Sequence, residues 1–316
     1  MRISVVLPVR DEESLLEEAL ESLLRQSERD FEVIAVGDGS SDAVRAVLAR
    51  FAARDGRVKP LHQPRSGIVA ALNRGLRQAR GTYIARMDAD DICRPERLAL
   101  QADFLDREPN IGLVGSRVEY FGDANKNEGL AHFVRWSNSL IAARDISLYR
   151  FVESPLIHPS VMFRRALPKR FGPYRDGPFP EDYELWLRWM ERGVSMAKLE
   201  ETLLEWRERP GRLTRTDPRY SVDAFYQTKA PYLYRWLERH NAHHPAVIVW
   251  GSGRTSRQRL RFLAALGIRV EAFVDIDPRK VGHRIGGAEV IWPGALPARL
   301  HTLGLRPGPV HGRPLV

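Results

Sequence analysis

The stretch GTYIARMDADD at residues 81–91 is the part of the sequence that says most about the fold. Its apolar portion, residues 83–87, has the length and residue types of a buried β-strand. Asp88, Asp90 and Asp91 follow directly, and in an extended chain Asp88 and Asp90 point to the same side. Hard divalent cations such as Mg²⁺ or Mn²⁺ prefer oxygen ligands of this kind. A solvated turn in which Asp90 or Asp91 caps the next helix explains the same pattern equally well.

The segments on either side of this stretch alternate between two periodicities. Short apolar runs are separated by segments whose apolar residues recur every three or four positions, which is typical of strand–helix–strand units. This alternation predicts an α/β fold with a mainly parallel sheet that is covered by helices on both faces. The expected strands span residues 3–8, 31–36, 58–61, 83–87 and 111–118, and the expected helices span residues 12–25, 42–53 and 68–79, with a further helix opened by Pro95.

Polar residues stand where three of the expected strands end. Because ligands of such sheets bind at the carboxyl ends of the strands, we expect the three segments to line one crevice. A metal ion held there could bridge two phosphates of a bound nucleotide and stabilise a diphosphate as it leaves. The three segments are residues 9–11, 38–40 and 88–91.

The second of these segments lies within VGDGSSD, residues 36–42. Asp38 follows a strand, where its carboxylate can accept a hydrogen bond from the edge of a nucleobase. The same residues are typical of a glycine turn before a helix. In either case we expect Asp42 to be the N-cap of that helix, with Ser40 or Ser41 near the cap.

A third acidic group occurs in PEDYELW, residues 180–186, at the start of an expected helix over 181–192. A carboxylate such as Asp182 can take a proton from a hydroxyl that is held close to it. The helix dipole also favours acidic residues in a first turn, so the spacing alone leaves both explanations open.

Length and composition restrict the class of protein. A chain of 316 residues with 43% hydrophobic content allows one large domain, or a domain of about 200–250 residues with a smaller one. The single cysteine, Cys93, excludes an internal disulfide framework, so we expect a reducing cytoplasm. The opening residues are typical of a strand rather than a signal peptide, and no apolar stretch reaches the roughly 18 residues of a membrane span.

The net charge of +9 has two explanations. It suits an anionic partner such as nucleotide phosphates or an anionic membrane face, or it reflects an arginine-rich composition without a dense basic run. The sequence has no zinc-finger, basic-zipper or aromatic–basic RNA signature, so no nucleic-acid partner is expected.

A second strand–turn–helix–strand pattern follows residues 243–245. The turn Gly251-Ser252-Gly253 after a strand, with Asp275 at the end of the next strand, is a partial dinucleotide fingerprint. About 70 residues make only half of a complete dinucleotide-binding fold, so a structural or docking module is favoured over a nucleotide site. The expected strands span residues 247–250 and 270–274, and the expected helix spans residues 256–266.

In this order the segments resemble the family 2 glycosyltransferases with the GT-A fold. That family has Pro-x-Tyr-Asn-x-Glu, Val-Asp-Asp-Gly-Ser-x-Asp, Asn-x-Gly-x-x-x-Ala-x-Asn-x-Gly and Gly-x-Tyr-Ile-x-x-Leu-Asp-Ala-Asp-Asp. His-Pro-Ser-x-Met-Phe-Arg-Arg and Glu-Asp-x-x-Leu-Trp come later. One such motif is weak, but six in the same order are specific. The matching segments are residues 8–13, 36–42, 65–75, 81–91, 158–165 and 181–186.

The resemblance implies an inverting, metal-dependent glycosyltransferase. Its donor would be a nucleotide-diphosphate sugar, with UDP-sugars preferred, and its acceptor a hydroxyl of a glycan or lipid-linked glycan. Mn²⁺ or Mg²⁺ would be held by Asp90, with Asp91 in support. The product would be a bacterial surface glycan such as lipopolysaccharide, built in the cytoplasm or at the inner face of the cytoplasmic membrane by a peripherally associated enzyme.

The resemblance also assigns roles to single residues. Asp38 would contact the nucleobase and Asp88 the ribose. Asp182 would be the catalytic base, with Glu181 beside it at the acceptor. The other donor-binding residues would be Pro8, Val9, Arg10, Glu12, Arg65, Gly67, Asn73, Ala89 and His158.

Four positions depart from the family pattern. Gly37 replaces the first acidic residue of the usual pair, so base recognition would rest on Asp38. Arg10 and Asp11 replace Tyr and Asn. Arg209 stands where the family has His, which could alter the contact with the diphosphate. The Gln-x-x-Arg-Trp motif of processive members is absent, which favours single additions.

The C-terminal segment resembles a different family. Its GSGR turn and AFVDIDPRKVGHRIGGAEVI, residues 272–291, are similar to the Rossmann-like N-terminal domain of sugar O-acyltransferases. Such a unit could mediate homo-oligomerisation. The expected divisions are a catalytic domain at 1–220, a helical linker at 221–244, a small α/β unit at 245–292 and a Pro/Gly-rich tail at 293–316.

Two other functions fit parts of this pattern. A catalytically silent sugar-nucleotide-binding or scaffold subunit would keep the same fold, although the presence of Asp90 and Asp182 argues against it. A nucleic-acid-binding protein is suggested only by the charge.

Overall fold

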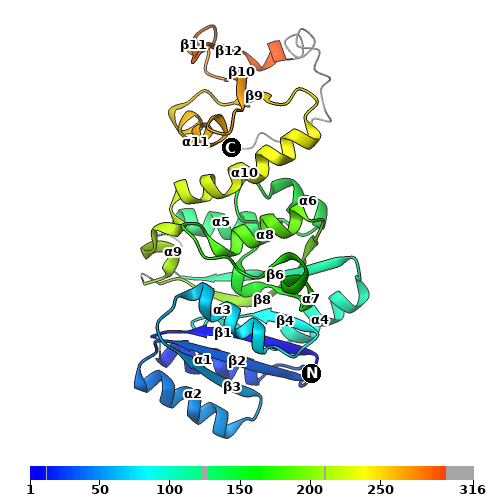
Figure 1. The fold of residues 1–316 in the computed structure, drawn as a ribbon, viewed down its shortest axis with the longest axis vertical. Helices are drawn as coiled ribbons and strands as arrows, with labels where there is room; N and C mark the ends of the chain where they lie inside the picture. Colours follow the sequence, from blue (N-terminus) through cyan, green and yellow to red (C-terminus); the bar gives the residue numbers. More distant parts are fainter. Residues whose placement is uncertain (12, 123–126, 210, 297–316) are drawn as a thin grey trace. The chain divides into compact units, whose positions relative to one another are not determined.

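The protein is described by a computed structural model that covers residues 1–11, 13–122, 127–209 and 211–296. The chain forms two compact units, residues 1–220 and residues 221–316 (Figure 1). Glu12 and most of the expected tail, residues 297–316, lie outside the described residues.

The first unit is built on an eight-stranded mixed sheet in the order β3-β2-β1-β4-β7-β6-β8-β5. Strands β3, β2, β1 and β4 are mutually parallel, which confirms the parallel arrangement expected from the sequence. Strand β7 is antiparallel to β4 and β6, and β5 is antiparallel to β8. The strands are β1 (Ile3–Val9), β2 (Phe31–Asp38), β3 (Val58–Gln63), β4 (Tyr83–Arg86), β5 (Ile92–Cys93), β6 (Ile111–Phe121), β7 (Met162–Arg164) and β8 (Ser195–Arg207).

Helices cover both faces of this sheet, as the nearly unbroken apolar sequence of β1 requires. Apolar side chains of α1, α2 and α4 form one core with one face of the sheet, and those of α3, α6, α7 and α8 form a second core with the other face. The helices are α1 (Glu13–Leu24), α2 (Asp42–Arg54), α3 (Ile68–Gln78), α4 (Arg97–Arg107), α5 (Glu128–Ser139), α6 (Ala143–Tyr149), α7 (Ala166–Phe171), α8 (Glu181–Glu191) and α9 (Leu213–Thr216).

The chain changes direction across the sheet next to β1. Strands β2 and β3 continue from β1 on one side, and β4 then pairs with β1 on the other side (Figure 1). In parallel sheets the carboxyl ends of the strands at such a switch point are where ligands bind. The acidic stretch that follows β4 therefore lies at the expected place.

Some local predictions were wrong. The N-cap of α2 is Ser41, whose hydroxyl accepts from the Val44 N–H, whereas Asp42 is the first helical residue. Helix α4 begins at Arg97 rather than at Pro95.

Two larger segments were underestimated. Between residues 119 and 180 no helix or strand is predicted from the sequence, but the described residues there form α5, α6, β7 and α7, as well as the end of β6. Strand β8 was missed because charged residues interrupt its apolar ones, and its pairing with β6 shifts register twice around Arg117.

The second unit contains α10 (Val222–His240) and a four-stranded sheet in the order β11-β12-β10-β9. The expected strand–turn–helix–strand pattern is present, with Gly251 at a φ of 91° in the turn. Asp275 accepts from the Ser252 N–H (2.9 Å), so its carboxylate holds this turn. The elements are β9 (Ala246–Trp250), α11 (Arg254–Ala264), β10 (Arg269–Val274), β11 (Arg284–Ile285) and β12 (Ala288–Ile291).

Among the described residues, none of the helices is both long and apolar enough to cross a bilayer. The similarity of the second unit to sugar O-acyltransferase domains stays a prediction, and so do the functional boundaries within residues 221–316.

Candidate active site

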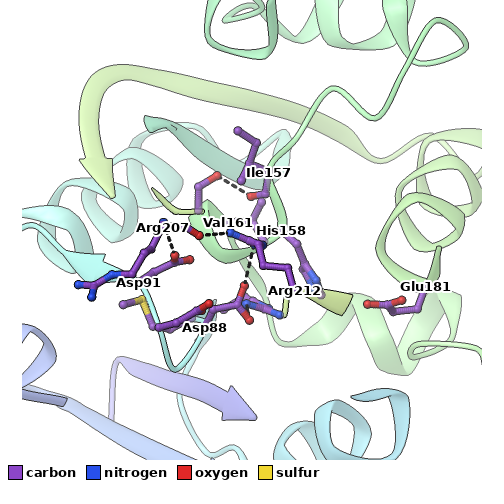
Figure 2. Close-up of polar contacts among 12 residues, drawn as sticks. Asp88, Asp91, Ile157, His158, Val161, Glu181, Arg207 and Arg212 are labelled. Atoms are coloured by element: carbon purple, nitrogen blue, oxygen red, sulfur yellow. Dashed lines mark hydrogen bonds and ion pairs between the residues drawn. The ribbon is translucent and has the colours of Figure 1, made fainter. Parts of the chain in front are cut away.

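Three carboxylates gather immediately after β4. Asp88, Asp90 and Asp91 each place an oxygen within 4.8 Å of the others (Figure 2 shows Asp88 and Asp91). Asp91 is fully buried and Asp90 is 6% exposed. Three carboxylates this close together repel one another when charged. A positively charged partner is therefore needed to stabilise their ionised forms.

The cluster fits a hard divalent cation. Asp91 Oδ1 accepts from the backbone N–H of Arg207 (2.8 Å), which orients the carboxylate. Asp91 Oδ2 is buried and has no hydrogen-bond partner among the described residues. A buried carboxylate oxygen without a donor, beside two further carboxylates, is the donor set that Mg²⁺ or Mn²⁺ takes.

The acidity of the cluster reflects this crowding. Burial, followed by the charge of Asp88, raises the pKa of Asp90 to about 6. The same two causes raise the pKa of Asp91 well above its ordinary value. The pKa of Asp90 is raised although the guanidinium of Arg209 lies close to its carboxylate.

Three arginines surround these carboxylates. Buried Arg86 forms an ion pair with Asp88 Oδ1, and Arg212 Nη2 lies 3.8 Å from Asp88 Oδ2. Arg209 Nε lies 2.6 Å from Asp90 Oδ2. Sequence analysis singled out Arg209 but missed Arg86 and Arg212. The available signal for Arg86 was a charged residue inside an otherwise apolar strand.

A second acidic pair lies in the first turn of α8. Glu181 is buried and accepts from the hydroxyl of Tyr220 (2.6 Å), a residue that the sequence reasoning missed. Asp182 is half-buried and accepts from the Tyr183 N–H (2.7 Å). Figure 2 shows Glu181 on the α8 side of the site, apart from Asp91.

Arg86 connects the two acidic groups. Burial raises the pKa of both Glu181 and Asp182, and the Arg86 guanidinium, which pairs with Asp88, offsets part of that rise. The carboxylates after β4 and those at the start of α8 thus interact with the same buried guanidinium, and we treat them as one candidate site.

If Asp182 takes a proton from a hydroxyl, as its sequence pattern allows, the pH dependence of that reaction should follow the pKa of Asp182. Burial, followed by the charge of Glu181, raises the pKa of Asp182 to about 7. A base works only when deprotonated, so the rate should rise with pH and level off above about 7. We expect kcat/KM to show an acidic limb with an apparent pKa near that value. A flat profile between pH 5.5 and 8 would contradict the assignment.

His158 is buried against Tyr174 and Trp186 rather than exposed to solvent. Its Nε2 is hydrogen-bonded to the Tyr174 hydroxyl (2.8 Å), and its ring packs edge-on against Trp186. Burial, followed by the charge of Arg86, holds the pKa of His158 well below its ordinary value, so the ring is neutral. The Asn73 side chain donates to the Tyr174 carbonyl (2.9 Å) and accepts from the Tyr174 N–H (3.1 Å). These two bonds fix the backbone of the residue that contacts His158.

Asp38 joins the end of β2 to the loop before α3. Its carboxylate accepts from the N–H groups of Ser66 (2.7 Å) and Gly67 (2.8 Å) and from Gln63 Nε2 (2.8 Å). A nucleobase would have to share or replace these donors. Next to it, Gly39 has a φ of 65°, and a Cβ there would meet Arg65 Cβ at 2.7 Å, so only glycine suits the close approach.

The remaining predicted donor residues differ in exposure. Pro8 and Val9 in β1 are buried, and Ala89 is half-buried against the core. Arg10 and Arg65 are exposed, and Arg10 Nε lies 3.2 Å from Asp11. The structure thus gathers Asp88, Asp90 and Asp91 after β4 and places Glu181 and Asp182 in the first turn of α8, and the individual roles stay predictions.

The mixed sheet covered by helices, with an acidic cluster after β4 at its switch point, has the GT-A fold. Solved structures show this fold. TarS of S. aureus in complex with UDP-GlcNAc is similar with a TM-score of 0.57 and 18% identity, over 84% of this chain and 71% of that chain. The mannosyltransferase PcManGT from Pyrobaculum calidifontis, in complex with GDP-Man and Mn²⁺, is similar with a TM-score of 0.51 and 20% identity, over 84% and 68%.

The chain belongs to the family described as Glycosyl transferase family 2, which matches residues 4–171, more than half of its length. The amylovoran biosynthesis glycosyltransferase AmsE of Erwinia amylovora is 33% identical over 60% of this chain and 69% of its own length. The UDP-Gal:alpha-D-GlcNAc-diphosphoundecaprenol beta-1,3-galactosyltransferase of Escherichia coli is 28% identical over 65% and 73%. The protein is a glycosyltransferase, as the sequence motifs predicted.

Proposed function

We propose that the protein is an inverting, metal-dependent glycosyltransferase that moves a sugar from a UDP-sugar to a hydroxyl acceptor during the synthesis of a bacterial surface glycan. One observation carries the proposal. Asp88, Asp90 and Asp91 form a cluster that could hold a cation, and both this cluster and the candidate base, Asp182, interact with the charge of buried Arg86.

Each acidic group has a distinct task in this reaction. Asp90 and Asp91 would hold Mn²⁺ or Mg²⁺, which when bound supplies charge stabilisation for the departing diphosphate. Asp182 takes the proton from the acceptor hydroxyl, and its pKa near 7 matches that of an efficient base at neutral pH. Glu181, fixed by Tyr220, keeps negative charge beside Asp182 and so keeps that pKa high.

Inversion follows from the single base. The acceptor oxygen, activated by Asp182, attacks the anomeric carbon from the face opposite the diphosphate. The bond to the diphosphate oxygen breaks as the new glycosidic bond forms, and the proton passes to Asp182. No second carboxylic acid is needed to balance the charge on the leaving diphosphate, because Asp90 and Asp91 would hold a cation that does so.

The relatives support the donor and acceptor classes. TarS and PcManGT were solved with nucleotide sugars, and the Escherichia coli relative is named for a UDP-sugar donor and a lipid-linked acceptor. We therefore propose a UDP-sugar donor and a glycan or lipid-linked glycan acceptor for this chain, with peripheral contact to the inner face of the membrane.

A donor panel tests the function. Release of nucleotide diphosphate is measured with UDP-, GDP- and dTDP-sugars in the presence of Mn²⁺, with and without EDTA. We expect slow hydrolysis of at least one UDP-sugar, abolished by EDTA and restored by added Mn²⁺. Full activity in EDTA would contradict the metal role, and turnover of GDP-sugars alone would contradict the uridine preference.

The donor reaction should not require residues 245–316. All the predicted donor and metal residues lie in the first compact unit, residues 1–220. A chain truncated after Asn241 should still bind UDP and hydrolyse the donor slowly, although its solubility or oligomeric state can change. Loss of UDP binding in a truncated chain that stays folded by circular dichroism would show that the C-terminal unit completes the donor site.

A further inference from the structure

Arg209 occupies the carboxylate that the proposed metal site needs. Its Nε lies 2.6 Å from Asp90 Oδ2, and Asp90 is only 7% exposed at its side chain. A guanidinium and a divalent cation repel each other, so a cation bound to Asp90 competes with Arg209 for the charge of this carboxylate. Ligation through Oδ2, alone or together with Oδ1, is favoured once Arg209 has left this oxygen.

Arg212 supplies a second, fixed positive charge to the same cluster. Its guanidinium lies 4.2 Å from the centre of the Trp206 ring, and its Nη1 donates to the carbonyl of Arg207. Its side chain is 9% exposed, whereas that of Arg209 is 30% exposed. The cluster thus has a held guanidinium facing Asp88 and a more exposed one on Asp90.

We propose that Arg209 couples cation binding to diphosphate binding by exchanging Asp90 for a phosphate oxygen. The inference rests on the proposed function. Without nucleotide, Arg209 neutralises Asp90. When the nucleotide diphosphate enters, Arg209 releases Asp90 and pairs with the diphosphate, whose oxygens suit the planar fork of a guanidinium. Both carboxylate and phosphate keep a positive partner throughout.

This exchange makes the two binding events depend on each other. Mn²⁺ alone has to displace Arg209 without compensation, whereas in the presence of UDP the displaced guanidinium gains a new anionic partner. Binding free energies are linked reciprocally, so UDP should strengthen Mn²⁺ binding by the same factor as Mn²⁺ strengthens UDP binding. We expect that factor to be about 10 or more in the unmodified protein.

Calorimetric titrations of Mn²⁺ alone, and of UDP with and without saturating Mn²⁺, test the proposal. Arg209→Ala should bind Mn²⁺ alone about tenfold more tightly and bind UDP in saturating Mn²⁺ about tenfold more weakly, so the linkage factor falls. Arg209→Lys retains the positive charge but not the planar fork, and should restore part of the linkage. Arg215→Ala is the matched control, because Arg215 pairs with Glu208 in the same segment and touches none of the three carboxylates.

Two results would overturn the inference. If Arg209→Ala and Arg209→Lys both weaken Mn²⁺ binding, Arg209 only supports Asp90. If Mn²⁺ binding tightens while UDP affinity stays unchanged, Arg209 is a counter-ion without a role at the diphosphate. A failure of the proposed function has a different signature, namely Mn²⁺ binding that Asp90→Asn does not weaken.

Discussion

Replacing Asp182 by asparagine should lower the turnover number by about 10²- to 10⁴-fold, the usual contribution of general base catalysis. Asparagine keeps the size of the side chain and can still accept from the Tyr183 N–H at the Oδ1 position. It cannot take a proton from the acceptor. The affinity for the donor should therefore change little, and the acidic limb of the pH–rate profile should disappear together with the activity.

The measurement is steady-state transfer with saturating donor and acceptor, together with UDP titration of the same preparation. Asp176→Asn is a suitable control, because Asp176 is 77% exposed and precedes the same helix. A collapse of UDP affinity in Asp182→Asn would move this residue to the donor site and leave the base unassigned. Retained turnover would exclude it as the base.

Replacing Asp90 by alanine should abolish transfer while the protein stays folded. Asp90 belongs to the carboxylate cluster, and its loss removes a ligand of the proposed cation and the partner of Arg209. We expect the affinity for Mn²⁺ to fall by at least about tenfold, because the affinity of a metal site depends steeply on the residues that form it. The affinity is measured from the electron paramagnetic resonance signal of the free ion. Asp30→Asn, at an exposed carboxylate far along the chain from the cluster, is the control.

Stability gives an independent reading of the same residue. The pKa of Asp90 is about 6 in the folded protein, above the value of about 3.9 for an unfolded chain. Between these values the folded state binds the extra proton, so its stability falls as pH rises through this range. Asp90→Asn removes that charge. Its melting temperature at pH 7 without metal should equal or exceed that of the unmodified protein, and a clear decrease would mean that the Arg209 ion pair is a net stabilising contact.

Much of the fold of residues 1–118 could be predicted because its signals are local. The apolar runs of β1, β2 and β4 and the helical periodicity of α1 and α3 lie within one or two residues of the expected bounds. Strands β5 and β7 have two and three residues, too few to show any periodicity. These strands exist only because neighbouring strands offer them hydrogen-bond partners.

The sequence by itself indicated the family through six motifs in order, and it located the acidic cluster and the proposed base because each lies in a short contiguous motif. Only the tertiary structure decided which charges meet. Strand β8 pairs with β6 and β5 and so returns the chain to the acidic cluster, where Arg207 meets Asp91 from 116 positions away and Arg209 meets Asp90 from 119. Sequence patterns report periodicity along one segment, whereas the partner of a buried charge depends on the register of strands that pair over long distances.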